Sequence, residues 1–166
     1  IAMARPLPTD YAPFYETYVQ LVTDDDLIKA LQSSPDEIRE NLASIPAEKM
    51  DYAYAEGKWT VRELLQHMID AERVFAYRAM AFASGEQQNL PGFDENKYSA
   101  IAKVAARSIS EMKEELMILR RSVYFMYKGL IDEDLLRSGI ANNSLVTVNA
   151  LGYIMIGHIR HHFAVI

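Results

Sequence analysis

Hydrophobic positions along this chain recur with the 3.6-residue period of α-helices, and the alternating pattern of β-strands is almost absent. The pattern predicts helices over residues 9–22, 24–44, 60–84, 99–128 and 147–166. The second helix is expected to be broken or kinked at Ser34-Pro35, because the acidic residues that follow are typical of a new helix N-terminus. The longer amphipathic segments predict an all-α fold, a four-helix bundle with additional short N-terminal helices.

The helix that follows Thr60 carries the clearest start signal. Thr60 and Glu63 form a capping-box pattern, in which the threonine hydroxyl accepts from the Glu63 amide and the carboxylate reaches back. The polar connection over residues 86–97 comes after this helix and is longer than a usual helix–helix link of about 2–8 residues. We expect it to cross the end of the bundle or to cover a site. A second connection is expected over residues 132–144.

Length and composition limit the class of protein. A chain of 166 residues, half of them hydrophobic, fits one domain over residues 1–166 with a buried core. No apolar run reaches the roughly 20 residues that a membrane-spanning helix needs. Residues 1–5 lack the charged and apolar regions of a secretory signal. The chain contains no cysteine, which excludes disulfides, catalytic thiols and cysteine-based zinc fingers, and a cytoplasmic location is therefore expected.

The charge balance argues against nucleic-acid partners. The formal net charge is −6, and the densest charged run is the acidic stretch Asp24-Asp25-Asp26. Proteins that bind DNA or RNA use basic patches to displace counterions from phosphates. We therefore expect no nucleic acid among the partners of this chain, and the lack of a long apolar run leads us to expect no membrane either.

The four histidines are the candidate chemistry of the chain. His67 lies in the apolar stripe of one predicted helix, whereas His158, His161 and His162 lie in another. Residues four apart on a helix are stacked one turn above the other, so His158 and His162 can direct their rings to one point. His161 satisfies the geometry by spacing as well, three residues after His158. The apolar stripe of this helix runs through His158 and His162, so His161 lies nearer the edge of the stripe.

Three histidines from two separated helices could hold a metal ion with a coordination position left open. Neutral imidazole suits zinc, nickel, copper or iron(II), and affinity alone does not select among them. A three-histidine set with an exchangeable water is more typical of catalytic than of structural zinc sites. The alternative is that the histidines only pack in the core or lie on the surface.

Carboxylates near the histidines give weaker signals. No glutamate follows His158 as it would in an HExxH helix, which argues against a zinc protease of that class. Glu63 and Asp70 could orient the His67 ring, although capping or surface roles explain both more simply.

Polar residues of the long connection are a further weak signal. Asp94, Glu95 and Tyr98 could reach a substrate, but a solvated loop is the simpler interpretation. No glycine-rich phosphate loop and no GxSxG serine motif occurs. The catalytic residues therefore stay unassigned at the level of sequence.

The stretches around the histidines combine into a specific motif. They are GKWTVRELLQHMIDAERVFAYR at 57–78, LPGFDE at 90–95 and GHIRHHF at 157–163. The pattern GKW-T-x-x-E-x-x-x-H with a terminal H-x-x-x-H resembles the DinB-like (DinB/YfiT) superfamily. The resemblance runs from about residue 24 to the end of the chain.

This resemblance implies a four-helix bundle in an unusual order, with long crossovers, that forms a homodimer. It also implies a divalent metal ion, zinc or nickel, with iron and manganese as further options. At the matching positions its ligands fall on His67, His158 and His162.

The resemblance further implies a metal-dependent enzyme that acts on a small organic electrophile. We expect a thiol-dependent transferase, using a low-molecular-weight thiol as partner, or a hydrolase. The alternative is a metal- or ligand-binding stress-response protein without catalysis.

Overall fold

Four long helices form the body of the molecule, in a computed structural model that describes residues 3–166. These helices are α2 (Leu27–Ala43), α3 (Val61–Ala83), α5 (Ile109–Lys128) and α7 (Val148–Ala164). Residues 1 and 2, the start of the N-terminal stretch considered above, lie outside the described residues. In the part of the chain that is described, no helix is both long and apolar enough to cross a bilayer.

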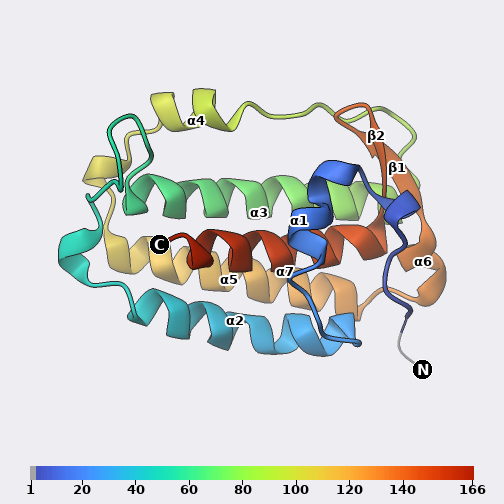
Figure 1. Ribbon diagram of the computed structural model, residues 1–166. Helices are drawn as coiled ribbons and strands as arrows, with labels where there is room; N and C mark the ends of the chain where they lie inside the picture. The colour runs from blue at the N-terminus through green and yellow to red at the C-terminus, as the bar shows by residue number, and fades with distance from the viewer. Residues whose placement is uncertain (1–2) are drawn as a thin grey trace.

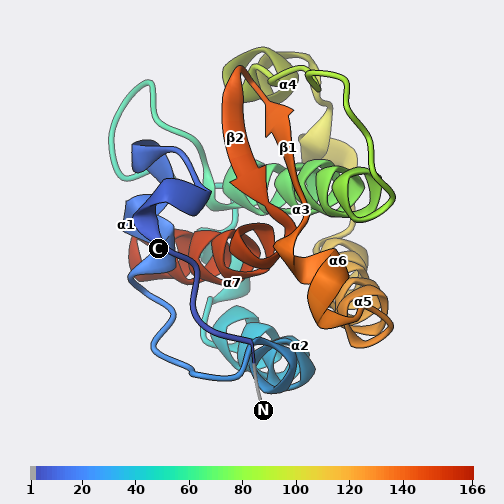
Figure 2. The same cartoon turned by 90° about the vertical axis from the view of Figure 1, so that its right-hand side faces the viewer.

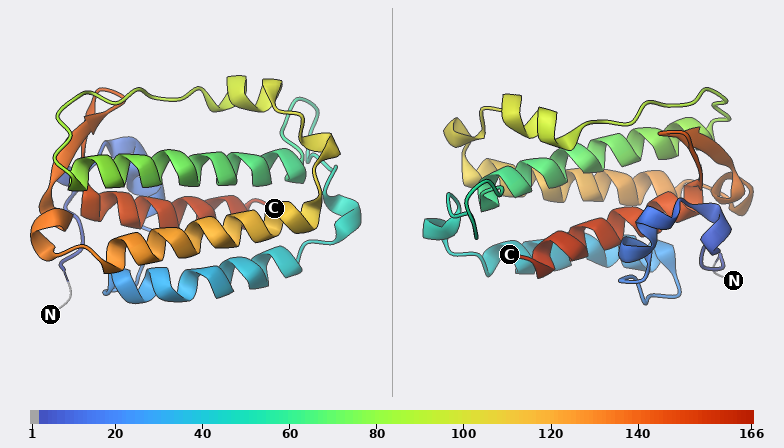
Figure 3. Two further views of the ribbon diagram at one scale, coloured as in Figure 1. Left: turned by 180° about the vertical axis from the view of Figure 1, so that it is seen from behind. Right: turned by 45° about the horizontal axis from the view of Figure 1, so that its top comes forward.

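The four helices are not arranged in chain order. Both α2 and α3 pack against α5 and α7, so the consecutive helices α2 and α3 occupy opposite corners of the bundle (Figures 1 and 2). The colour gradient of Figure 1 shows α3 and α5 running in the same direction. The chain must therefore return along the whole bundle between them, as Figure 3 shows from behind. The four-helix bundle with a long crossover is confirmed.

The returning segment carries a helix of its own, α4 (Glu95–Ile101), and a 3-10 turn at Val104–Ala106. The predicted long helix from residue 99 is therefore wrong at its start, because α5 begins only at Ile109. The Ser108 hydroxyl caps it by accepting from the Glu111 amide (3.3 Å). This Ser-x-x-Glu pattern is the start signal that the periodicity concealed.

The helix α2 runs unbroken through Pro35, so the predicted new start at Ser34 is wrong. Proline removes one backbone hydrogen bond from a helix interior. Here Ser34, Pro35, Leu31 and Ile38 are all buried, and packing of the continuous stripe outweighs that cost.

The N-terminal segment forms three short elements rather than one helix over residues 9–22. They are 3-10 turns at Pro8–Asp10 and Pro13–Tyr15, followed by α1 (Glu16–Val19). The close packing of α1 on α7, visible in Figure 2, depends on Gly157. A Cβ atom at Gly157 would lie 1.9 Å from the Tyr18 carbonyl oxygen, so only glycine admits this approach.

A small hairpin closes one end of the bundle where only a connection was predicted. After α6 (Asp132–Leu136), strands β1 (Ser138–Ala141) and β2 (Ser144–Thr147) pair antiparallel. Asn142 and Asn143 adopt φ angles of 49° and 65°, as the two central residues of a type I′ turn do. Asparagine tolerates this left-handed region better than most residues, which explains the pair.

A buried ion pair joins the four long helices. The Arg120 side chain on α5 has no exposed surface, and its Nε and Nη2 donate to the two Glu72 carboxylate oxygens of α3 (2.5 and 3.0 Å). Its Nη1 donates to the Ser34 hydroxyl of α2 (2.6 Å), and Nη2 also donates to the Met155 carbonyl of α7 (2.8 Å). Each end of the pair is therefore compensated by polar atoms inside the core.

Candidate metal centre

His67 is placed by the N-terminal cap of α3. The Thr60 hydroxyl accepts from the Glu63 amide (3.1 Å) and donates to the Glu63 carboxylate (3.2 Å). The predicted cap is thus confirmed, although the carboxylate pairs with the hydroxyl of Thr60. Two turns further on, the His67 side chain points into the bundle and is 5 % exposed.

His158 and His162 come from the last two turns of α7, which runs antiparallel to α3. Thr147 begins this helix as predicted, because its hydroxyl accepts from the Ala150 amide (3.0 Å). The Nε2 atom of His158 lies 3.0 Å from Nε2 of His67 and 3.0 Å from Nε2 of His162. One ring nitrogen from each of the three residues lies within 4.8 Å of the others. The structure therefore brings the three predicted residues together.

His161 takes no part in this cluster. Its half-buried ring contacts Tyr18 and the ring of His162, with centroid distances of 5.3 and 5.2 Å. Spacing alone left His161 equivalent to His162, and the position on the flank of the stripe separates the two.

The donor set fits a divalent cation. The Nε2 atom of His158 faces the Nε2 atoms of His67 and His162. A ring nitrogen carries at most one hydrogen, so Nε2 of His158 can donate a hydrogen bond to only one of these two neighbours. A cation would instead accept a lone pair from every ring. Imidazole nitrogens bound at about 2.0–2.1 Å from a tetrahedral zinc stand about 3.3 Å apart, close to the two 3.0 Å separations at His158.

Burial keeps the three imidazoles neutral, the form that binds metals. It lowers the pKa of His67 to about 4. Burial, together with the neighbouring His67 and His161, lowers the pKa of His162 to about 3. The pKa of His158 lies well below its ordinary value, again mainly through burial. All three rings therefore offer lone pairs at neutral pH.

The metal-free protein should lose stability as the pH falls from 7.5 to 5. The unfolded chain protonates its histidines near pH 6.5, whereas folded His67 stays neutral down to about pH 4. The contribution of His67 to the free energy of unfolding is fully present above pH 6.5. It is lost on acidification, by about 2 kcal/mol at pH 5. Urea unfolding in the presence of a chelator measures this loss. His67→Gln should reduce the pH dependence by that amount, and an unchanged dependence would contradict it.

Aromatic rings enclose the cluster. The ring of Trp59 lies 4.9 Å from that of His67, while Tyr18 and Phe75 lie 5.2 and 5.7 Å from that of His158, between centroids. Such apolar surroundings limit the access of water and lower the local dielectric.

Glu95 is the functional residue that sequence reasoning undervalued. Its Oε2 lies 3.5 Å from Nε2 of His67, and its side chain is half-exposed in the first turn of α4. Burial raises the pKa of Glu95, and the charge of Asp94 raises it further. The unusual length of the connection was the available signal, since its residues form α4, whose first turn brings Glu95 to His67.

The carboxylates closer in sequence serve other partners. Asp70 accepts from the Gln66 amide (2.9 Å), and Glu63 caps α3 and accepts from Ser99 (3.4 Å). The simpler roles considered for both residues are therefore the observed ones. Tyr98 packs against Phe93, with 5.4 Å between ring centroids.

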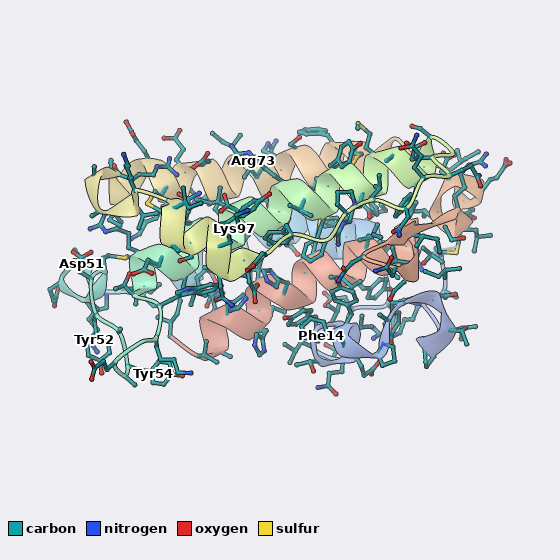
Figure 4. All side chains as sticks on the ribbon, turned by 90° about the horizontal axis from the view of Figure 1, so that it is seen from above. Phe14, Asp51, Tyr52, Tyr54, Arg73 and Lys97 are labelled. Atoms are coloured by element: carbon teal, nitrogen blue, oxygen red, sulfur yellow. The ribbon has the colours of Figure 1, made fainter. Side chains whose placement is uncertain are left out.

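Two cavities reach the histidines from different sides. One of about 650 Å³ is lined by His162, Trp59, Tyr52 and Tyr54. Another of about 480 Å³ is lined by His67, His158 and Phe14, among others. Figure 4 shows Tyr52 and Tyr54 at one end of the molecule and Phe14 well apart from them. Glu95 lines both cavities, so small molecules can approach the cluster from either side.

Comparison with known proteins agrees with the geometry. Residues 30–166 match the family model described as the DinB superfamily. A protein of Oceanobacillus iheyensis with the provisional name of metal-dependent hydrolase is 25 % identical over 147 residues, covering 86 % of this chain and 84 % of its own. The solved structure of YfiT from Bacillus subtilis is described as a probable metal-dependent hydrolase with an unusual four-helix bundle topology. It superposes with a TM-score of 0.72 and 23 % identity, covering 83 % of this chain and 80 % of its own.

Proposed function

This chain belongs to the DinB superfamily, and from that premise we propose that it is a divalent-metal-dependent enzyme, a hydrolase of small organic molecules. The proposal is carried by the convergence of His67, His158 and His162, whose ring nitrogens lie within 4.8 Å of one another beside two cavities. The hydrolase names of the similar proteins support the reaction class. Zinc or nickel suits the imidazole donors.

The histidines of the site would bind the ion, and a carboxylate beside them would transfer protons. His67, His158 and His162 would hold the ion, and a bound divalent ion supplies an activated water and polarises a carbonyl group. Glu95, within reach of the cluster, would accept the proton of the nucleophile and pass it to the leaving group. The aromatic rings keep bulk water away from the reacting bond.

Dependence on a low-molecular-weight thiol, formation of a homodimer and a cytoplasmic location stay predictions of the family resemblance. A thiol-dependent transferase would use the same histidines, so an assay with and without added thiol separates it from a hydrolase. Turnover that requires the thiol would favour the transferase.

The test begins with elemental analysis of protein purified without a nickel column. We expect about one divalent ion per chain, and hydrolysis of a panel of small esters and amides that a chelator stops and added metal restores. Glu95→Gln leaves every imidazole in place, so it should retain the ion while turnover falls about a hundredfold. Bound metal without turnover on any ester, amide or thiol substrate would instead support the non-catalytic binder.

A further inference from the structure

Arg78 is a buried cation that lacks an acidic partner. Its side chain lies on α3, three turns after His67, and is 4 % exposed. Nη2 donates to the Pro91 carbonyl (3.1 Å), and the guanidinium carbon lies 5.9 Å from the centre of the Phe75 ring. Among residues 3–166, no carboxylate oxygen lies within 4 Å of its nitrogens. A buried charge without a counter-charge is costly, so this arginine needs a reason to be there.

Arg120 shows how the same protein treats a buried arginine with a structural role. Two Glu72 oxygens, the Ser34 hydroxyl and the Met155 carbonyl surround its guanidinium. Arg78 has only the Pro91 carbonyl, which leaves most of its donors for something else. An anionic ligand would supply the missing charge.

Arg78 opens on the cavity of about 480 Å³ that His67 and His158 also line. His67, Ala71, Phe75 and Arg78 follow one another at four, four and three residues, so they form one face of α3 along this cavity. The first and last of these Cα atoms are about 16 Å apart along the axis. Helical side chains tilt toward the N-terminus, so the guanidinium points back toward the histidines.

The two ends of this cavity carry opposite charge. Asp94 and Glu95 line it at the histidine end, where Glu95 lies beside His67. At the other end, Pro91 binds Arg78, and its neighbour Gly92 approaches the Asn142 side chain of the hairpin. The wall between them is aromatic, with Tyr15, Tyr18, Phe75 and Phe93.

We propose that this cavity is the substrate site and that the substrate carries a carboxylate, which Arg78 binds, on an apolar or aromatic body. This inference rests on the proposed function. The hydrolysed ester or amide carbonyl lies at the histidines, on the order of 10 Å from the carboxylate. Water adds across the acyl bond: its oxygen stays on the acyl carbon, the carbon–heteroatom bond breaks, and the alcohol or amine leaves with a proton.

The chemistry of the cavity favours a carboxylate over free phosphate. The planar guanidinium fork binds a carboxylate with two parallel hydrogen bonds. The aromatic wall contributes binding only to a ligand with an apolar body. Inorganic phosphate lacks such a body and should bind weakly.

The test measures binding of 4-phenylbutanoate to the chelator-treated protein by calorimetry, with 4-phenylbutanol and inorganic phosphate as comparison probes. The carboxylate should bind best, and Arg78→Gln should weaken it about tenfold to a hundredfold. Arg73→Gln is the matched control, because Arg73 lies on the same helix and pairs with Glu115 outside the cavity (2.7 Å). It should bind like the wild type, and Arg78→Lys should fall between wild type and Arg78→Gln.

Equal binding of the carboxylate by wild type and Arg78→Gln would overturn the proposal, as would equal binding of the alcohol, or tighter binding of phosphate. Unfolding temperatures check the fold, and removal of an uncompensated charge should leave Arg78→Gln at least as stable as the wild type. A clear loss of stability would point to a structural arginine.

In cobalt-loaded protein, paramagnetic relaxation should place the phenyl ring of the probe between cation and guanidinium. Carboxylate binding at Arg78 in a protein that binds no metal would refute the proposed metal-dependent function and leave the proposed carboxylate site standing.

Discussion

Replacing His158 with alanine should weaken binding of a divalent ion about a hundredfold to a thousandfold. The apparent free energy of a structural zinc site is about 10–16 kcal/mol over four ligands, so one imidazole accounts for roughly 2.5–4 kcal/mol. His158 is the central member, because its Nε2 lies 3.0 Å from both other Nε2 atoms. Competition titrations with a chromophoric chelator measure the change, and turnover should disappear with the ion. His67→Ala and His162→Ala should behave alike.

His161→Ala is the control, since it removes an imidazole from the same turn of α7 that offers no nitrogen to the cluster. It should retain the affinity of the wild type. An affinity that falls equally for His161→Ala and His158→Ala would mean that the ion binds to the surface of the helix end. Unchanged affinity in all four variants would show that the histidines only pack.

Arg120→Leu should destabilise the fold by about 3–5 kcal/mol, a factor of a hundred to several thousand in the folding equilibrium. The substitution leaves the Glu72 carboxylate buried without its counter-charge, and it also leaves the Ser34 hydroxyl and the Met155 carbonyl without a donor. Denaturant unfolding of the metal-free protein, read by circular dichroism, measures the loss.

The double variant Glu72→Leu with Arg120→Leu should recover much of that stability, because no charge is then buried alone. Arg121→Leu is the matched control: Arg121 is exposed on the next position of α5, packs on Phe125, and should cost less than about 1 kcal/mol. A double variant as unstable as Arg120→Leu would mean that the shape of the two side chains, rather than their charges, holds the four helices.

Much of the fold could be predicted from local signals. Thr60 and Thr147 start α3 and α7 as expected, because capping residues act within one turn of the helix. The helix break predicted at Pro35 was wrong because the effect of a proline depends on tertiary packing, which the sequence pattern does not show. The hairpin was missed because its strands have only four residues each, although Asn142-Asn143 is a turn signal in its own right.

The site residues, too, could be predicted where the signal is local and were missed where it depends on tertiary structure. His158 and His162 could be paired by spacing, and the apolar stripe of α3 marked His67. Glu95 could not be assigned, because its position depends on how the crossover folds back over α3. Arg78 gave no local signal either, since its burial and lack of an acidic partner follow from the arrangement of α3 against the segment at Pro91.

The contact between Gly157 and the Tyr18 carbonyl has a consequence for how the His158 ring is covered. It holds Tyr18 against the ring of His158, and Tyr18 precedes residues 30–166, which carry the family match. Tyr18, which covers one imidazole ring, and the two helices that carry the three imidazoles thus belong to different stretches of polypeptide. Any side chain at position 157 would force the Tyr18 backbone away from α7 and uncover the ring of His158.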